Sequence, residues 1–176
     1  MAVDPTTTSI PRWPTASDAV VPEQSALWHL VIAVGAAART AAQAVVRRLP
    51  PNRSQTIALI DATDSALAEA LEPARVGWRF TVVGSGHHLE QVRARVTACG
   101  ALDTELTCIS VDGDSGYRQP SRHVFCAHCR TVTVTAIRIG DVMRCGGCDS
   151  MLTVYYHYSR RHHAYMGYRA DSEELM

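Results

Sequence analysis

Four cysteines near the C-terminus are the residues whose type and spacing most directly indicate chemistry. Cys126 and Cys129 form one C-x2-C pair, Cys145 and Cys148 form a second, and fifteen residues separate the pairs. Each pair can present two sulfurs on one tight turn, and a hairpin between the turns would bring the pairs together as a tetrahedral cage. Such a cage suits Zn²⁺ or, alternatively, a single rubredoxin-like iron ion. We predict a metal site rather than disulfides.

Residues around these cysteines extend the prediction. Gly146 and Gly147 are expected to supply the tight turn that lets backbone N–H groups approach the sulfurs. His128 lies inside the first pair and could replace a cysteine as ligand, although four cysteines already complete a tetrahedral site. Cys99 and Cys108 are interpreted as buried free thiols. Reduced thiolates and the absence of a recognisable signal peptide predict a cytoplasmic protein, and no apolar run reaches the length that crosses a bilayer.

The elements that must position the cysteines follow from the pattern along the chain. Short apolar runs alternate with helical patterns before the cysteines, which predicts a parallel sheet covered by helices. We therefore expect an α/β fold with a small parallel-sheet Rossmann-like lobe, followed by a C-terminal zinc-ribbon β module of three strands. The expected strands of the lobe are 27–34, 56–60, 78–83 and 105–111, and its expected helices are 36–49, 65–72 and 89–98.

Composition divides the chain into segments. The net charge is zero, yet residues 118–169 carry eight arginines against two aspartates, and the chain contains no lysine. The segment 118–169, which contains the predicted ribbon, therefore carries a net positive charge. The expected organisation is a flexible Pro/Thr-rich arm over 1–25, a parallel α/β lobe over 26–112, a linker over 113–120, a four-cysteine metal ribbon with a basic aromatic tail over 121–169, and an acidic tail over 170–176.

The lobe offers only weak candidates for a nucleotide site. Gly35 opens the first helix but is followed by alanines, which remove the close approach to phosphate that a glycine-rich loop permits. Gly84 and Gly86 precede another helix, where a structural turn is the more frequent explanation for such a G-x-G sequence. We expect no bound cofactor in the lobe. No nucleophile elbow, zinc-protease motif or glycosidase-like carboxylate pair is present, so no catalytic residue is predicted.

The segment 155–168 interleaves aromatic residues with arginines. This composition is typical of a protein-docking hot spot and, alternatively, of a surface that stacks on nucleic-acid bases. A solvated basic tail would not need so many tyrosines. Overall neutrality and the absence of lysine count against nucleic acid. We predict a protein-docking surface made by Tyr158, Arg160, Arg161 and Tyr165.

A stretch near the C-terminus, residues 124–167, resembles the small subunit of bacterial dimethylamine monooxygenase. The resemblance rests on Val124–Cys129, Cys145–Cys148, Tyr158–Arg161 and Ala164–Gly167. It implies a non-catalytic subunit of a multi-subunit NAD(P)H-dependent oxygenase that demethylates dimethylamine to methylamine and formaldehyde. It also implies partners, namely a large subunit that holds haem and a reductase subunit that holds FMN and a 2Fe–2S centre. In this setting the metal site would scaffold the complex or, if it holds iron, relay electrons.

The N-terminal half resembles the nicotinamide-binding lobe of ferredoxin-reductase-like proteins. Residues 30–36 and 82–86 with the following helix carry this resemblance. The family's glycine-rich first loop is replaced by alanines, and its Cys-Gly-Pro signature by Val83-Gly84-Ser85. The resemblance therefore implies a degenerate lobe that kept the fold without the cofactor.

Overall fold

The chain divides into two compact units. The computed structural model describes residues 8–15, 23, 25–111 and 122–171. One unit comprises Trp13–Gly116, and the other comprises Met1–Arg12 together with Tyr117–Met176. The predicted linker over 113–120 lies outside the described residues, as do most of the predicted arm and most of the acidic tail.

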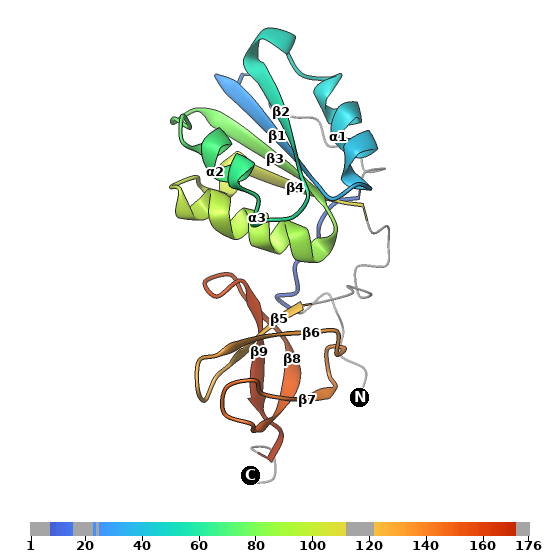
Figure 1. Cartoon of the computed structure of the whole chain (residues 1–176), viewed down its shortest axis with the longest axis vertical. Helices are drawn as coiled ribbons and strands as arrows, with labels where there is room; N and C mark the ends of the chain where they lie inside the picture. Colours follow the sequence, from blue (N-terminus) through green and yellow to red (C-terminus); the bar gives the residue numbers. More distant parts are fainter. Residues whose placement is uncertain (1–7, 16–22, 24, 112–121, 172–176) are drawn as a thin grey trace. The chain divides into compact units, whose positions relative to one another are not determined.

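The first unit is an α/β lobe built on a parallel sheet, sheet A, as the sequence predicts. Its four strands lie in the order β2-β1-β3-β4, and every pair is parallel. In Figure 1, α1 covers one face of the sheet, and α2 and α3 cover the other. The bounds are β1 Trp28–Val34, α1 Ala38–Val46, β2 Ser54–Leu59, α2 Ser65–Leu71, β3 Trp78–Gly84, α3 Gly86–Ala98 and β4 Leu106–Ser110, with short 3-10 helices η2 Pro51–Arg53 and η3 Asp103–Glu105.

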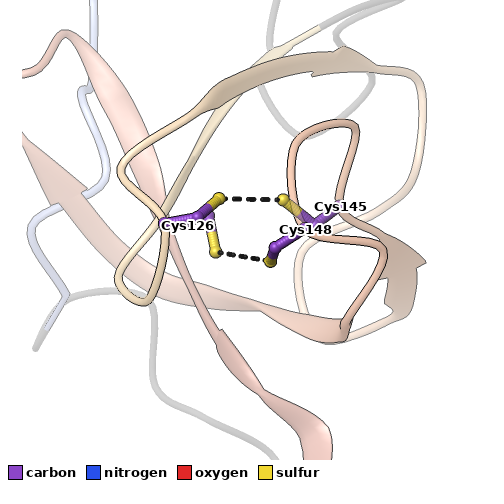
Figure 2. A group of neighbouring side chains, drawn as sticks. Cys126, Cys145 and Cys148 are labelled. Carbon is purple, nitrogen blue, oxygen red and sulfur yellow. Dashed lines mark hydrogen bonds between the residues drawn. The ribbon is translucent and has the colours of Figure 1, made fainter.

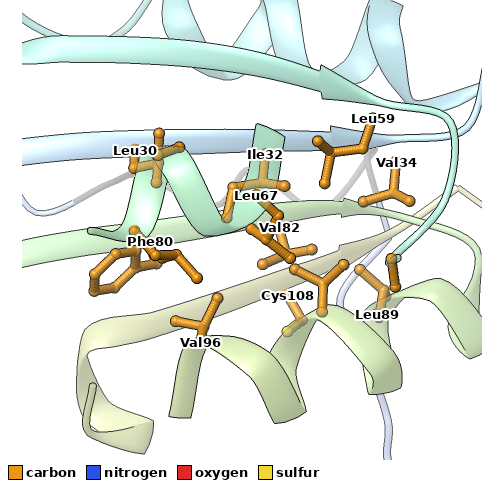
Figure 3. Close-up of a cluster of buried hydrophobic side chains, with 14 residues drawn as sticks. Leu30, Ile32, Val34, Leu59, Leu67, Phe80, Val82, Leu89, Val96 and Cys108 are labelled. Atoms are coloured by element: carbon orange, nitrogen blue, oxygen red, sulfur yellow. The ribbon is translucent and has the colours of Figure 1, made fainter. Parts of the chain in front are cut away.

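Two apolar layers explain why the lobe sequence contains continuous apolar runs. β1 pairs with a strand on each side and has a helix layer over each face, so six of its seven residues are buried. Under α2 and α3, Leu30 and Ile32 of β1 pack with Leu89 (Figure 3). Under α1, Val31 and Ala33 pack with the helix. Local capping is also visible, because the Asp64 carboxylate accepts a hydrogen bond from the Ala66 N–H at the start of α2.

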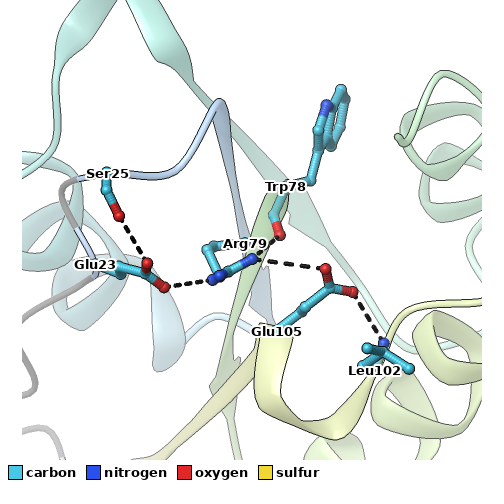
Figure 4. A network of polar contacts seen from close by, with 6 residues as sticks. All are labelled: Glu23, Ser25, Trp78, Arg79, Leu102 and Glu105. Atoms are coloured by element: carbon cyan, nitrogen blue, oxygen red, sulfur yellow. Dashed lines mark hydrogen bonds and ion pairs between the residues drawn. The ribbon is translucent and has the colours of Figure 1, made fainter. Parts of the chain in front are cut away.

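Polar contacts join the segment before β1 to the start of β3 and to η3. Figure 4 shows Arg79 between two carboxylates, with its Nε 2.7 Å from Glu23 and its guanidinium 3.6 Å from Glu105. Glu105 also accepts a hydrogen bond from the Leu102 N–H. Because these ion pairs are partly exposed, each adds little stability and mainly fixes geometry.

The second unit is built on a five-stranded sheet, sheet B, rather than the three-stranded ribbon that the sequence predicts. The strand order is β6-β5-β9-β8-β7. β9 pairs in parallel with β5 and antiparallel with β8, so the predicted basic aromatic tail forms the end of β8, a turn and the central strand of the sheet. The bounds are β5 Arg122–Cys126, β6 Val132–Thr135, β7 Val142–Arg144, β8 Met151–Ser159 and β9 Ala164–Arg169.

Residues near the N-terminus complete the core of the second unit. Ile10 is 8% exposed and packs in the same cluster as Val124 and Leu152. The hydroxyl of Ser9 donates to the Tyr158 carbonyl at 3.3 Å and accepts from the Tyr158 N–H at 2.8 Å. The predicted flexible arm thus contains a stretch that packs against residues almost 150 positions away in sequence.

No helix among the described residues is both long enough and apolar enough to cross a membrane.

Candidate metal centre

The first cysteine pair lies on a compact turn that follows β5. The Cys126 N–H donates to the Thr131 carbonyl at 2.9 Å, and the Arg130 N–H donates to the Cys126 carbonyl at 2.9 Å. Arg130 has a φ of 66°, a left-handed conformation that costs energy for any residue with a Cβ. These constraints hold both sulfurs on the same side of the turn.

The second cysteine pair lies on a turn of the same construction after β7. The Cys145 N–H donates to the Ser150 carbonyl at 2.9 Å, the Asp149 N–H donates to the Cys145 carbonyl at 3.1 Å, and Asp149 has a φ of 62°. Each backbone hydrogen bond of the first turn therefore has a counterpart in the second. Two equivalent turns, each presenting two sulfurs, are the arrangement that four-cysteine metal sites use.

The four sulfurs converge as a metal ion requires. Their Sγ atoms all lie within 4.8 Å of one another, and Cys126 faces Cys148 at 3.9 Å while Cys129 faces Cys145 at 3.5 Å. In Figure 2, Cys126 lies opposite Cys145 and Cys148. Four sulfurs about 2.3 Å from a central ion would stand roughly 3.8 Å apart at tetrahedral angles. A disulfide would need a distance of about 2.05 Å between two sulfur atoms. The spacing fits a four-thiolate metal ion, and the cysteines are free.

The glycines of the second turn let a backbone N–H approach a sulfur, as predicted, because the Gly147 N–H donates to the Cys145 Sγ at 3.4 Å. Neither Gly146 nor Gly147 has a positive φ. A Cβ on Gly147 would lie 2.7 Å from the Cβ of Thr131, closer than side chains approach one another. The Gly146 N–H donates to the Thr133 hydroxyl at 3.1 Å. The two turns therefore pack against each other through backbone that only glycine permits.

Hydroxyl groups beside the cysteines tune their acidity, and sequence reasoning missed them. Hydrogen bonding to Ser150, whose Oγ lies 3.5 Å from Cys148 Sγ, lowers the pKa of Cys148 to about 5. Hydrogen bonding to Thr131 likewise lowers the pKa of Cys129. Both hydroxyls stand two residues after the second cysteine of a pair, a C-x2-C-x-[ST] signal that is visible in the sequence.

Cys126 is harder to ionise than Cys129 and Cys148. Burial raises the pKa of Cys126 to about 11, so metal binding must release a proton from this thiol. His128 is exposed and hydrogen-bonds to Cys148, which contributes to the low pKa of that thiol. The histidine lies outside the group of residues whose ligand atoms converge.

The structure splits the predicted docking residues into two groups. Arg160 and Arg161 are exposed in the turn between β8 and β9. Tyr158 and Tyr165 are instead 4% and 1% exposed, because they pack edge to face in the core at a ring distance of 5.2 Å. The two buried tyrosines are structural, which corrects their assignment to a contact surface. The exposed aromatic residues of this region are Tyr155 and Tyr168.

The weak nucleotide candidates of the lobe do come together. Gly35 follows β1, and Gly84 and Gly86 lie at the end of β3 and the start of α3, at the point where the strand order reverses and α/β sheets bind ligands. A Cβ on Gly35 would lie 3.5 Å from the His88 ring, so this side chain occupies the space above the loop. The Ser85 hydroxyl lies 3.0 Å from Nδ1 of His88.

The two other cysteines differ from each other. Cys108 is buried in sheet A, and burial raises its pKa to about 12. Cys99 is exposed, contrary to prediction, because it lies at the C-terminal end of α3. Neither belongs to the converging group of sulfurs.

Fold and site together define a small α/β protein that carries a separate β unit with a cysteine cluster able to hold a metal ion. The family described as "Dimethylamine monooxygenase subunit DmmA-like, C-terminal domain" matches residues 123–168. The chain is also 30% identical over 171 residues to the "Heme-dependent oxidative N-demethylase delta subunit" of Ectopseudomonas mendocina (strain ymp), across 94% of this chain and 90% of that protein. The chain therefore belongs to the family of DmmA-like dimethylamine monooxygenase subunits, as its resemblance predicts. No solved structure matches it.

Proposed function

We propose that this chain is a non-catalytic subunit of a multi-subunit NAD(P)H-dependent dimethylamine monooxygenase. The observation that carries the proposal is the likeness to a delta subunit of a haem-dependent oxidative N-demethylase along nearly the whole of both chains. In this proposal the complex oxidatively demethylates dimethylamine to methylamine and formaldehyde. Haem belongs to a large partner subunit, and FMN with a 2Fe–2S centre belongs to a reductase subunit.

The cysteine cluster supports a scaffolding role. Zn²⁺ bound to Cys126, Cys129, Cys145 and Cys148 would cross-link two turns that are separated in sequence, and such sites contribute on the order of 10–16 kcal/mol of apparent binding free energy. The second unit draws its core from sheet B and from Ile10, so it is small for a self-sufficient fold. We therefore assign the metal the task of holding this unit rigid while it couples the haem and reductase subunits.

Substitution of one ligand tests the scaffold. Cys126→Ser should abolish metal retention, unfold the second unit and release the chain from its partner subunits, because three thiolates cannot complete the site. Cys99→Ser is the matched control, since it removes an exposed thiol outside the cluster. Metal content, thermal unfolding and co-purification with the haem subunit are the three measurements. A Cys126→Ser chain that stays folded and assembled would refute the structural role.

Metal analysis of the purified complex decides between zinc and the alternative, a rubredoxin-like iron that relays electrons between flavin and haem. The geometry of four thiolates admits both ions. An Fe(III)–thiolate site is red and a zinc site is colourless. A red protein with one iron per chain would replace the scaffold proposal with the relay.

A further inference from the structure

One face of sheet B is buried and the other is exposed, yet both faces carry apolar side chains. Val124, Val154 and Leu152 face the core and are at most 1% exposed. On the opposite face, Val134 is 62% exposed and Met151 is 46% exposed. The exposed apolar side chains run across the sheet from β6 to β7 and comprise Val132, Val134, Tyr168, Tyr155, Met151 and Val142.

Strand register makes these side chains one continuous surface, which we call the outer face of sheet B. Residues paired directly across neighbouring strands point to the same side of a sheet. Val132 is paired with Phe125, and Phe125 with Met166. Across the other half of the sheet, Tyr168 is paired with Thr153, and Thr153 with Val142. The outer face thus spans all five strands.

The alternation in β6 is the reverse of what a solvated strand needs. An antiparallel sheet with one solvent-exposed face places apolar residues toward the core and polar residues toward solvent. In β6, Val132 and Val134 are exposed, whereas Thr133 and Thr135 are half-buried. Thr133 faces inward because its hydroxyl accepts the Gly146 N–H beside the cysteines. The valines are left on an edge strand, where exposed apolar side chains promote association unless another surface covers them.

Basic side chains lie beside this apolar surface. His162 of the β8–β9 turn stacks on Phe125 of the outer face at a ring distance of 3.9 Å and an angle of 11°. The same turn carries Arg160 and Arg161, both exposed. Over residues 122–171 as a whole, seven arginines stand against three aspartates. The outer face is therefore an apolar centre with a positively charged end.

We propose that the outer face of sheet B is the surface through which this chain docks to another subunit of the demethylase, one that presents an apolar patch beside carboxylates. This inference rests on the proposed function and names the surface that performs it. Four of the six exposed side chains of this face are valine or methionine, and its two tyrosines pack edge to face against each other at 5.4 Å. Arg144, which is paired with Met151 at the β7 edge of the face, forms an ion pair with Asp149 at 2.7 Å, so the net positive charge lies at the Arg160–Arg161 end. Both features favour protein over nucleic acid.

Val134→Glu tests the apolar centre. The substitution places a carboxylate where the partner would bury a methyl group, so affinity for the partner subunits should fall at least tenfold. Because Val134 is largely exposed, metal content and thermal unfolding should stay at the wild-type values. Val76→Glu is the matched control, since Val76 is 91% exposed on the lobe, and it should leave affinity unchanged. Affinity is measured by titrating the purified full-length chain, metal-loaded, against the purified haem and reductase subunits.

The charged end is tested separately with the double variant Arg160→Glu/Arg161→Glu. Affinity should fall, and the remaining binding should lose most of its sensitivity to salt, because steering by the two guanidinium groups is lost. The same loss of affinity at every salt concentration, with the wild-type salt dependence retained, would contradict complementary charge.

The outcomes separate this inference from the proposed function. If the wild-type chain binds neither subunit, the proposed function fails. If the wild-type chain binds and Val134→Glu binds equally well, the docking surface is elsewhere and the inference is overturned. It is also overturned if Val134→Glu leaves the subunits bound and instead dissociates a homodimer in sedimentation or abolishes retention on a nucleic-acid column.

Discussion

Gly147→Ala is the sharpest perturbation of the cysteine cluster that the structure suggests. The added Cβ would lie 2.7 Å from the Cβ of Thr131 and 3.1 Å from its Cγ2. Rotation about χ1 moves the Thr131 methyl group and hydroxyl but leaves its Cβ in place, so relief requires the two turns to separate. Separation of the turns moves Cys145 and Cys148 away from Cys126 and Cys129.

The expected cost follows from overpacking. An extra methyl group forced into a packed contact typically costs about 1–3 kcal/mol, and a contact this short belongs at the upper end. If the substitution destabilises the metal-bound state by about 3 kcal/mol relative to the metal-free state, zinc affinity should drop roughly a hundredfold. The reason is that 1.4 kcal/mol corresponds to a factor of ten in a binding constant. Competition with a chromogenic zinc chelator measures the ratio directly on the full-length chain.

The neighbouring glycine provides the control. A Cβ on Gly146 would meet the Thr133 hydroxyl at 3.3 Å, which a small side-chain shift relieves, so Gly146→Ala should weaken zinc binding by less than about tenfold. The double variant Thr131→Gly/Gly147→Ala should lose less affinity than the two single losses added together. Equal chelator resistance of Gly146→Ala and Gly147→Ala would refute the argument that the turns pack through Gly147.

Two further predictions concern stability. Ile10→Ala should lower the unfolding free energy of the second unit by about 2–4 kcal/mol through the cavity it leaves, whereas Ile60→Ala, at an 82% exposed site, should change little in the same denaturant titration. His29 is buried with neither ring nitrogen hydrogen-bonded, and burial, aided by Arg53 and Arg79, lowers its pKa from 6.5. Below pH 6.5 the unfolded state therefore binds more protons than the folded state. The stability that neutral His29 contributes is fully present above pH 6.5 and is lost as the pH falls below that value. His29→Leu should flatten the pH dependence of the lobe's melting temperature between pH 5 and 7, and an unchanged slope would contradict this assignment.

The lobe could be predicted closely because its signals are local. β1 is a continuous apolar run that ends at Gly35, and β3 likewise ends at the Gly84–Gly86 turn, so strand type and bounds follow from the sequence alone. The sequence predicts the start of α3 at Leu89, three residues later than the structure shows, because His87 and His88 are typical of a solvated loop. In the structure they form its first turn, where Ser85 contacts both rings.

The C-terminal β unit could be predicted only where the cysteines impose a constraint. The cysteine spacing predicts the two turns. The sequence of β9, however, does not alternate between apolar and polar residues, so it does not show which side chains point to the core. Tyrosine fits a core and a contact surface equally well, so Tyr165 and Tyr168 could not be told apart before the register was known. The packing of Ile10 was also beyond prediction, because no local pattern reports a contact with a strand at the other end of the chain.

The contribution of Ile10 to the sheet B core has a consequence for biogenesis. The ribosome makes Ile10 before the whole lobe and before sheet B, so the side chains against which it packs exist only after the lobe has been synthesised. The parallel lobe can form on the emerging chain, whereas ion capture must wait for both cysteine turns. A fragment cut at the front of the matched region, residue 123, would lack this isoleucine and should mature poorly when expressed by itself.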